Sequence, residues 1–463
     1  GLLFHRLNEG MSRVLSINKA LPRQIGPKGT AVHRHRPQVP DAPFTAASSR
    51  SSHIPRGAVH WQRGPSWASW GSFGGTGSRP ARCVIMRVYP EGAEIPKWER
   101  KYPDVERQVF EDAETGARAV MLASSHLGGQ NKYLGGALGG DGVVYGVPGG
   151  ARTVLSVRPD TGQVSAFGGP FEGAFKWLRG ITVGGTVYCL PSNAHSLLII
   201  QPGDPPTART VTHPCFQGDW MYHGGALAAD GCIYCVPCNA TTVLKIVPGP
   251  EPQFITFGEL PAMRQKWYGG VVASDGCIYC FPNCSDRCLK IAPGEEPEAE
   301  MFGDVPAGGW KWHGGCLGSD GNVYGIPAHS DEVLCIEPGP TPTARTFGGP
   351  IGTGTFRPEG KYKYGGGVLA PNGAVYAFPS DADRVLKICP IDSDVPEEER
   401  VRVIGPSFDT IDNKWQNGYV GRDGNVYAIP LNAEGVLQIL PRTDEVRTIG
   451  CFPGKDKWEG GVE

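Results

Sequence analysis

Side chains that could bind a ligand recur in a fixed order along residues 131–463. A Lys-Trp pair opens most units, and a polar loop with histidine, asparagine or aspartate follows it. Ammonium, imidazole, amide and carboxylate groups beside indole rings are the usual lining of a polar ligand site with aromatic anchors. The predicted ligand-binding residues are Lys176, Trp177, His223, Lys266, Trp267, Lys311, Trp312, His313, His329, Asp331, Asp381, Lys414, Trp415 and Asn432.

The repetition also supports a structural interpretation of these residues. A recurring tryptophan often wedges between neighbouring sheets, and a recurring asparagine or aspartate often bonds the backbone of a turn. The structural interpretation is favoured for the tryptophans. For the histidines and aspartates, which vary from unit to unit, both interpretations stay open.

A subset of the polar loops gives an alternative in which a divalent cation is bound. Imidazole nitrogen and carboxylate or amide oxygen are common metal ligands. The alternative metal ligands are His195, Asn239, His329, Asp331 and Asp381. The primary expectation is that the chain has no metal and no cofactor. No Ser/His/Asp nucleophile pattern or phosphate-binding glycine loop stands out, so no catalytic residue is predicted.

The cysteines around Cys232, Cys235 and Cys238 only superficially offer metal-ligand spacing. Residues three apart on a strand point to opposite faces, so Cys232 and Cys235 cannot easily hold one ion. The position of Cys235 is occupied by Gly325 and Ala377 in other units. We therefore expect these cysteines to serve as small packing residues with reduced thiols.

The elements that must position these residues follow from an internal repeat of about 45 residues. It runs Lys-Trp/Tyr-x-Gly-Gly, Asp-Gly-x-x-Tyr-x-x-Pro, Val-Leu-x-Ile and Phe-Gly. The opening positions of its seven copies are Lys132, Lys176, Met221, Lys266, Lys311, Lys363 and Lys414, and an eighth opening stands at 457–461.

Each copy predicts four short antiparallel strands, because glycine and proline interrupt the apolar runs at fixed positions. A sheet that is apolar on both faces cannot bury itself, so it must stack on copies of itself. The sequence therefore predicts an all-β chain, a β-propeller with seven four-stranded blades favoured over eight. Residues 107–122 and 457–462 could add a composite closing blade.

The order of Gly-Gly, Asp-Gly-x-x-Tyr, Val-Leu-x-Ile and Phe-Gly resembles the blade signature of the NHL, streptogramin-lyase and SMP-30-like propellers over roughly residues 107–463. The resemblance implies that the Gly-Gly strand is innermost, with the Lys-Trp pairs and the polar loops on one face. The proline after Tyr-x-x, as at Pro282, replaces the acidic residue commonly found there. No lone Glu, Asn and Asp of the innermost strands matches the metal site of the SMP-30-like hydrolases, so no catalytic residue is carried over.

Composition bounds the class of protein. With 67 Gly and 42 Pro among 463 residues, the chain cannot be mostly helical. A net charge of −2 argues against a general nucleic-acid binder, which carries a strong positive charge. No apolar run reaches the length of a membrane span. Residues 1–90 hold 13 Lys and Arg against 2 Asp and Glu.

That charge imbalance predicts a disordered basic leader or targeting segment at 1–90, followed by a linker with a possible partial closing blade at 91–130 and the propeller at 131–463. The absence of a long apolar signal region favours the cytoplasm, and the basic leader leaves organellar import open.

The predicted function is a non-enzymatic binding or scaffold propeller that presents a polar, aromatic-lined face to a protein or a small polar ligand. The alternative, implied by the resemblance, is a metal-assisted hydrolase or lyase of the SMP-30 or streptogramin-lyase type.

Overall fold

Turn residues divide each repeat into four strands. In the repeat that opens at Lys311, the first turn contains Asp320 and Gly321; Gly321 has φ +83°, which glycine adopts at little steric cost. The Asp320 carboxylate accepts the backbone N–H of Asn322 at 3.1 Å and closes the turn. Pro327 ends the second strand because proline has no N–H for the ladder.

The computed structural model describes residues 132–352, 361–408, 411–455, 457–458 and 461–462 in full, and the backbone of the strands at 2–3, 83–89, 107–111 and 118–124. The chain divides into two units, Leu7–Ser78 and the remainder, and every described residue belongs to the second of these. Most of the predicted leader at 1–90 and part of the predicted linker at 91–130 lie outside the described residues.

Seven four-stranded antiparallel sheets, here blades 1 to 7, account for the seven repeats, as predicted. Blade 1 is β5 (Tyr133–Leu138), β6 (Val144–Pro148), β7 (Val154–Val157) and β8 (Val164–Phe167). Blade 2 is β9 (Trp177–Val183), β10 (Thr186–Pro191), β11 (Ser196–Gln201) and β12 (Thr207–Thr212). Blade 3 is β13 (Tyr222–Leu227), β14 (Ile233–Pro237), β15 (Val243–Val247) and β16 (Gln253–Phe257). Blade 4 is β17 (Trp267–Val272), β18 (Ile278–Pro282), β19 (Arg287–Ala292) and β20 (Glu298–Asp304).

The last three blades follow the same order. Blade 5 is β21 (Trp312–Leu317), β22 (Val323–Pro327), β23 (Val333–Glu337) and β24 (Thr343–Phe347). Blade 6 is β25 (Tyr364–Leu369), β26 (Val375–Pro379), β27 (Val385–Ile388) and β28 (Val401–Ile404), with the 3₁₀ turn η2 (Glu397–Glu399) before its last strand. Blade 7 is β29 (Trp415–Val420), β30 (Val426–Pro430), β31 (Val436–Leu440) and β32 (Glu445–Ile449). Among the described residues there is no α-helix, and hence none long and apolar enough to cross a membrane.

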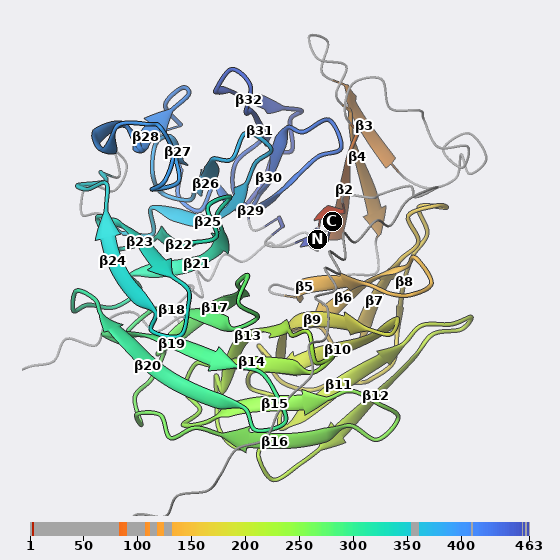
Figure 1. Ribbon diagram of the computed structural model, residues 1–463. Helices are drawn as coiled ribbons and strands as arrows, with labels where there is room; N and C mark the ends of the chain where they lie inside the picture. The colour runs from red at the N-terminus through yellow and green to blue at the C-terminus, as the bar shows by residue number, and fades with distance from the viewer. Residues whose placement is uncertain are drawn as a thin grey trace, which may run out of the picture. The chain divides into compact units, whose positions relative to one another are not determined.

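The first strands of successive blades contact one another from β5 through to β29, so they are the innermost strands of a β-propeller (Figure 1). A further sheet has the strand order β3-β4-β2-β1-β33. It contains the hairpin of β3 (Arg107–Glu111) and β4 (Arg118–Ser124), together with β2 (Cys83–Tyr89), β1 (Leu2–Leu3) and β33 (Gly461–Val462). β33 contacts β5 of blade 1, and its Gly461 carbonyl accepts the hydroxyl of Tyr419 in blade 7 at 2.6 Å.

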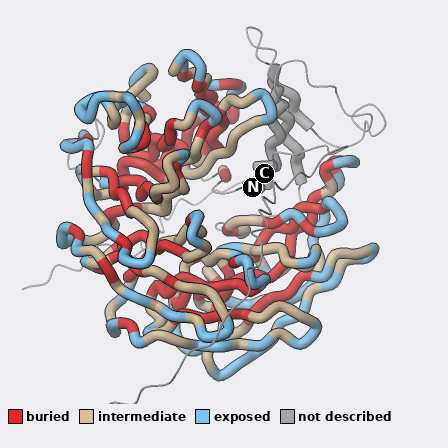
Figure 2. The backbone as a smooth tube through the Cα atoms, in the orientation of Figure 1, coloured by how far each residue is buried: buried red, intermediate tan, exposed pale blue. Residues whose placement is uncertain are grey.

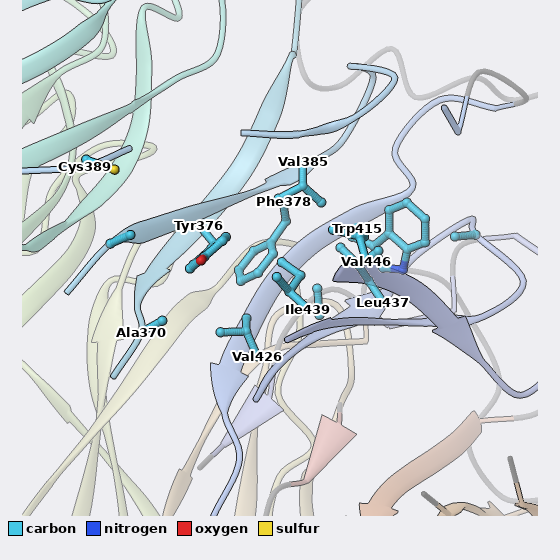
Figure 3. Packing of buried hydrophobic residues seen from close by; sticks show 13 residues of the cluster. Ala370, Tyr376, Phe378, Val385, Cys389, Trp415, Val426, Leu437, Ile439 and Val446 are labelled. Atoms are coloured by element: carbon cyan, nitrogen blue, oxygen red, sulfur yellow. The ribbon is translucent and has the colours of Figure 1, made fainter. Parts of the chain in front are cut away.

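Burial follows the position of a strand within its blade. The second strands are buried at every residue except Thr186 of blade 2, because a neighbouring blade covers each of their faces, whereas the outermost strands are largely half-buried or exposed (Figure 2). The cluster between blades 6 and 7 shows the packing: Phe378 and Val385 of blade 6 meet Trp415 and Leu437 of blade 7 (Figure 3). The core therefore lies between blades rather than inside any one sheet.

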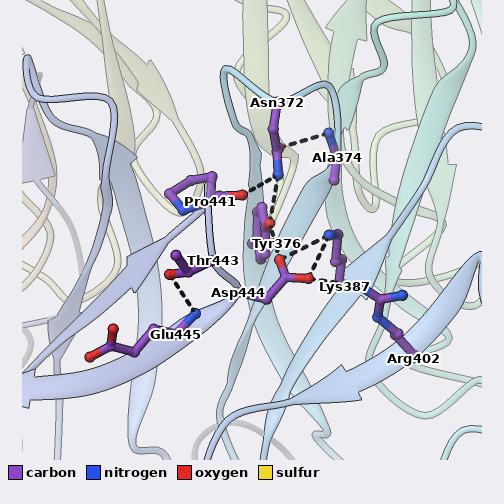
Figure 4. Close-up of polar contacts among 9 residues, drawn as sticks. All are labelled: Asn372, Ala374, Tyr376, Lys387, Arg402, Pro441, Thr443, Asp444 and Glu445. Carbon is purple, nitrogen blue, oxygen red and sulfur yellow. Dashed lines mark hydrogen bonds and ion pairs between the residues drawn. The ribbon is translucent and has the colours of Figure 1, made fainter.

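Tyrosines tie blades 2 to 6 each to the following blade, on the face that carries the Asp-Gly turns. The Tyr279 hydroxyl donates to the Asp275 carboxylate at 2.7 Å and accepts the backbone N–H of Gly339 in the next blade at 3.0 Å. Between blades 6 and 7 the acceptor is an aspartate of the following blade. Asp444 of blade 7 accepts from the Tyr376 hydroxyl of blade 6 at 2.7 Å and from the Lys387 ammonium of blade 6 at 2.7 and 2.8 Å (Figure 4).

Candidate functional site

The lysines at the start of the blades lie inside the protein. Lys266 is 0% exposed, and its ammonium donates to the carbonyls of Cys238 at 3.1 Å and Met263 at 3.2 Å. Because Cys238 belongs to the preceding blade, the lysine joins two blades. Burial lowers the pKa of Lys266 to about 8, with the neighbouring Cys238 opposing the shift. Lys176, Lys311 and Lys414 are also buried and donate to backbone carbonyls in the same way.

The tryptophans that follow these lysines are buried as well. In Trp177, Trp267, Trp312 and Trp415 the exposed fraction is at most 2%. Each indole N–H donates to a carbonyl at the start of the third strand or in the loop before it; for Trp267 the partner is Arg287 at 2.9 Å. This corrects the expectation of an open face lined by Lys-Trp pairs, because their side chains fill the space between blades and have no surface to offer a ligand.

The polar loop residues serve mainly to join blades. The Asp381 carboxylate accepts the backbone N–H of Asn413 at 2.7 Å, and the amide oxygen of Asn239 accepts that of Gln265 at 2.8 Å. Asn432 donates to the carbonyl of Asp412 at 3.0 Å. The bonds of Asp381 and Asn239 hold the entry of a blade against the preceding blade, whereas the bond of Asn432 lies within blade 7.

The remaining loop residues are also spread over different blades. Asp331 of blade 5 lies 2.7 Å from the ammonium of the buried Lys363 at the entry to blade 6. The ring of His329 lies 4.5 Å from that of Tyr362, and His195 is exposed. Within the described part of the chain, no three His, Cys, Asp or Glu residues are grouped so as to hold a metal ion. The alternative metal ligands are thus not brought together.

The three cysteines with metal-like spacing, Cys232, Cys235 and Cys238, are buried. Cys235 and Cys280 are 0% exposed in the second strands of blades 3 and 4. Burial raises the pKa of both thiols, so they stay protonated near neutral pH. A Cβ at Gly325, the matching position of blade 5, would lie 3.0 Å from the Cβ of Leu334, which shows how little room the position offers.

A β-bulge in the innermost strands releases one side chain per blade from the ladder. In blade 3 the pairing passes from Tyr222 opposite Pro237 to Gly225 opposite Cys235, so His223 and Gly224 together face one residue. Gly224 has φ +80°, a left-handed conformation that glycine adopts at little steric cost. Bulges redirect side chains, and the residues redirected in this way are Leu134, Leu178, His223, Tyr268, His313, Gly365 and Gln416.

Three of these redirected side chains form a stack across neighbouring blades. The ring centroids of His223 and Tyr268 are 3.3 Å apart in stacked geometry, and those of Tyr268 and His313 are 4.5 Å apart with a tilt of 36°. All three side chains are half-buried. Arg179, two residues into β9, lies beside them: its Nε would be 4.0 Å from a Cβ placed on Gly224. We call Arg179, His223, Tyr268 and His313 the bulge cluster.

The electrostatics of the bulge cluster favour neutral imidazoles next to a cation. Burial, then the nearby His313 and Arg179, hold the pKa of His223 well below its usual range. Burial also lowers the pKa of His313, and Arg179 adds to that effect. The Nδ1 of His313 lies 2.6 Å from the carbonyl oxygen of Gly365. Because a carbonyl can only accept, Nδ1 carries the proton and Nε2 keeps its lone pair.

In blades 2 to 7 the residue before the opening Lys or Met has a left-handed backbone. The φ angles are +51° at Phe175, +52° at Trp220, +59° at Trp310 and +50° at Tyr362. Such conformations cost energy in residues other than glycine and persist only where the surroundings hold them. Trp310 reaches the bulge cluster, with its ring centroid 6.5 Å from that of Tyr268.

Sequence reasoning identified only part of this arrangement. His223 and His313 are brought together as neighbours of one ring, whereas the lysines and tryptophans are buried away from them. Tyr268 and Arg179 were missed. The signal that could have found them is the contrast between repeats: the bulge position, before Gly-Gly in most units, changes from unit to unit while the residues around it stay the same.

No protein-family model matches the chain, and no curated protein sequence matches it. Solved structures show a likeness of fold. Streptogramin B lyase is 15% identical over 70% of this chain and 94% of its own, with a TM-score of 0.49. A catalytically inactive variant of virginiamycin B lyase from Staphylococcus aureus, with quinupristin, is 13% identical over 71% of this chain and 96% of its own, with a TM-score of 0.48.

A candidate 6-phosphogluconolactonase from Bacteroides uniformis is 16% identical over 65% of this chain and 97% of its own, with a TM-score of 0.42. At these identities the likeness concerns the fold alone. Streptogramin lyases are also among the propellers whose blade signature the repeat resembles.

Proposed function

We propose that the chain is a non-enzymatic β-propeller that binds a small polar ligand at the bulge cluster. The supporting observation is the His223, Tyr268 and His313 stack on the bulges of three consecutive blades. The fold does not require it, because the same bulge position holds Leu134 in blade 1 and Gly365 in blade 6. Side chains that differ between otherwise equal blades, gathered on neighbouring innermost strands, are the pattern of a recognition site rather than of a repeated structural contact.

The proposal is tested by ligand-detected NMR with a library that contains cationic, neutral and anionic small molecules. Compounds that bind the wild-type protein are retested on a His223→Gln/His313→Gln double variant and on Arg345→Gln, a control in the outermost strand of blade 5. The expected result is saturation transfer that the double variant loses and the control keeps. Failure of every class to bind, or equal binding to the double variant, would refute the proposal.

One observation favours a second candidate, a hydrolase or lyase of the metal-assisted type. The Nε2 of His313 is a neutral nitrogen base whose ring is held by the Gly365 carbonyl, as a general base requires. Turnover of lactones, esters and cyclic depsipeptides with and without added Mg²⁺, together with elemental analysis of the purified protein, tests this candidate. Turnover that His313→Gln abolishes would support it; no turnover and no bound ion would remove it.

A further inference from the structure

The bulge cluster presents one cation that the described protein does not neutralise. Within the described residues, the Arg179 guanidinium has no hydrogen bond and no ion pair, and the side chain is exposed on an innermost strand. Several other arginines in the described blades bond a carboxylate or a carbonyl, as Arg402 does with Asp444 at 2.7 Å. A planar guanidinium offers paired N–H donors that fit a carboxylate.

Arg179 sets the charge preference at its end of the bulge cluster. The rings of His223, Tyr268 and His313 pack face against face, so a ligand meets mainly their edges and an ammonium group finds little free ring face for a cation–π contact. A carboxylate beside the Arg179 guanidinium is stabilised, whereas an ammonium group there is repelled.

At the other end of the stack, His313 requires a hydrogen-bond donor from the ligand rather than an anion. His313 donates its Nδ1 proton to Gly365, so its Nε2 can only accept a hydrogen bond. Among the described residues this nitrogen has no protein donor. A ligand that spans the stack thus needs an anionic acceptor at one end, for Arg179, and an O–H or N–H donor at the other.

We infer that the bulge cluster recognises a hydroxycarboxylate with a flat body, its carboxylate held by the Arg179 guanidinium and its hydroxyl donating to Nε2 of His313. This inference rests on the proposed binding function and names its ligand class. The flat body lies along the row of ring edges, and Trp310 at 6.5 Å from Tyr268 borders the same space.

The test uses 4-hydroxybenzoate as the probe, with benzoate and 4-hydroxybenzyl alcohol as matched probes that lack the donor or the anion. Titration calorimetry on the full-length protein is expected to give binding of 4-hydroxybenzoate about tenfold tighter than that of benzoate, since tenfold corresponds to about 1.4 kcal/mol, the upper part of the range for one hydrogen bond. Arg179→Gln should weaken the binding of 4-hydroxybenzoate at least tenfold. His313→Phe should lower the affinity for 4-hydroxybenzoate to that for benzoate and leave the affinity for benzoate unchanged.

Arg345→Gln, matched in chemistry but on the outermost strand of blade 5, should change none of these values. Thermal melts of each variant check that folding is intact. Equal affinity for 4-hydroxybenzoate and 4-hydroxybenzyl alcohol, or an Arg179→Gln variant that binds like wild type, overturns the inference. If no probe binds while a cationic or neutral library compound binds at the cluster, the ligand class is wrong and the binding function stands. If no compound of any class binds there, both fall.

Discussion

Replacing Lys266 by methionine tests whether an ammonium is truly buried between blades 3 and 4. The pKa of Lys266 falls from 10.5 to about 8 on folding, and one pKa unit corresponds to 1.36 kcal/mol. Keeping this lysine charged in the folded protein therefore costs about 3 kcal/mol near neutral pH. Blade 3 has Met221 at the equivalent position, with 2% exposure, so the site accepts methionine without strain.

The sign of the pH effect follows from proton counting. Between pH 8 and about 10.5 the unfolded chain holds the Lys266 proton and the folded chain has lost it, so raising the pH stabilises the folded wild type. The Lys266→Met variant lacks this pH-dependent contribution to stability. Between pH 7 and pH 9.5 the free energy of unfolding of the wild type should therefore rise by about 2 kcal/mol relative to that of the variant. Near pH 7 the two should differ little, because the variant also loses the bonds to Cys238 and Met263.

The assay is urea unfolding followed by circular dichroism at pH 7 and pH 9.5. Comparing the two proteins cancels the titration of the buried thiols and tyrosines, which both contain. The reverse substitution, Met221→Lys, provides the matched test: it should destabilise blade 3 at pH 7 and do so less at pH 9.5. A difference in unfolding free energy between wild type and Lys266→Met that is the same at both pH values would refute the burial argument.

Three further perturbations test the packing and the charges. Trp267→Phe removes the hydrogen bond to the Arg287 carbonyl and leaves a void between blades. Differential scanning calorimetry should therefore show a loss of about 2–3 kcal/mol in the free energy of unfolding. An unchanged melting temperature would contradict the role of this tryptophan in packing the blades together. Asp331→Asn leaves the buried Lys363 ammonium without its anion and should cost about 1–2 kcal/mol in urea, reduced by the exposure of the aspartate; equal stability would mean that water replaces the carboxylate. Acidification from pH 7 to 5.5 should destabilise the protein by up to about 1 kcal/mol through His313, because the folded imidazole stays neutral while the unfolded one protonates near pH 6.5; His313→Phe should lose that part of the acid sensitivity.

The architecture could be predicted from the sequence because every level of it repeats. Asp-Gly turns, strand-ending prolines and apolar runs predict the same four strands in each unit, and the seven blades confirm that prediction. The roles of Lys266 and Trp267 could not be read in the same way. A Lys-Trp pair looks like a ligand anchor, yet backbone carbonyls of the folded protein satisfy the ammonium and the indole N–H, and only three-dimensional packing brings those carbonyls close.

The candidate site was harder to predict because it depends on an irregularity. A bulge shifts the register by one residue, and a pattern of alternating strand positions does not predict which side chain it releases. His223 and His313 attract attention by residue type. Arg179 does not attract attention, since blade 2 places its bulge on Leu178 and the arginine comes one residue later, where five of the other six blades have glycine and blade 7 has Asn417.

The inter-blade bonds run in opposite directions on the two faces of the propeller. On one face a lysine reaches back to the preceding blade, as Lys311 does to Ser285, and on the other a tyrosine reaches forward, as Tyr324 does to Ile391. A gene rearrangement that deletes a whole repeat therefore rejoins a compatible lysine and tyrosine at the new junction. A deletion that starts in mid-repeat leaves one of them without its counterpart, so gain or loss of material in this lineage is expected in whole repeats.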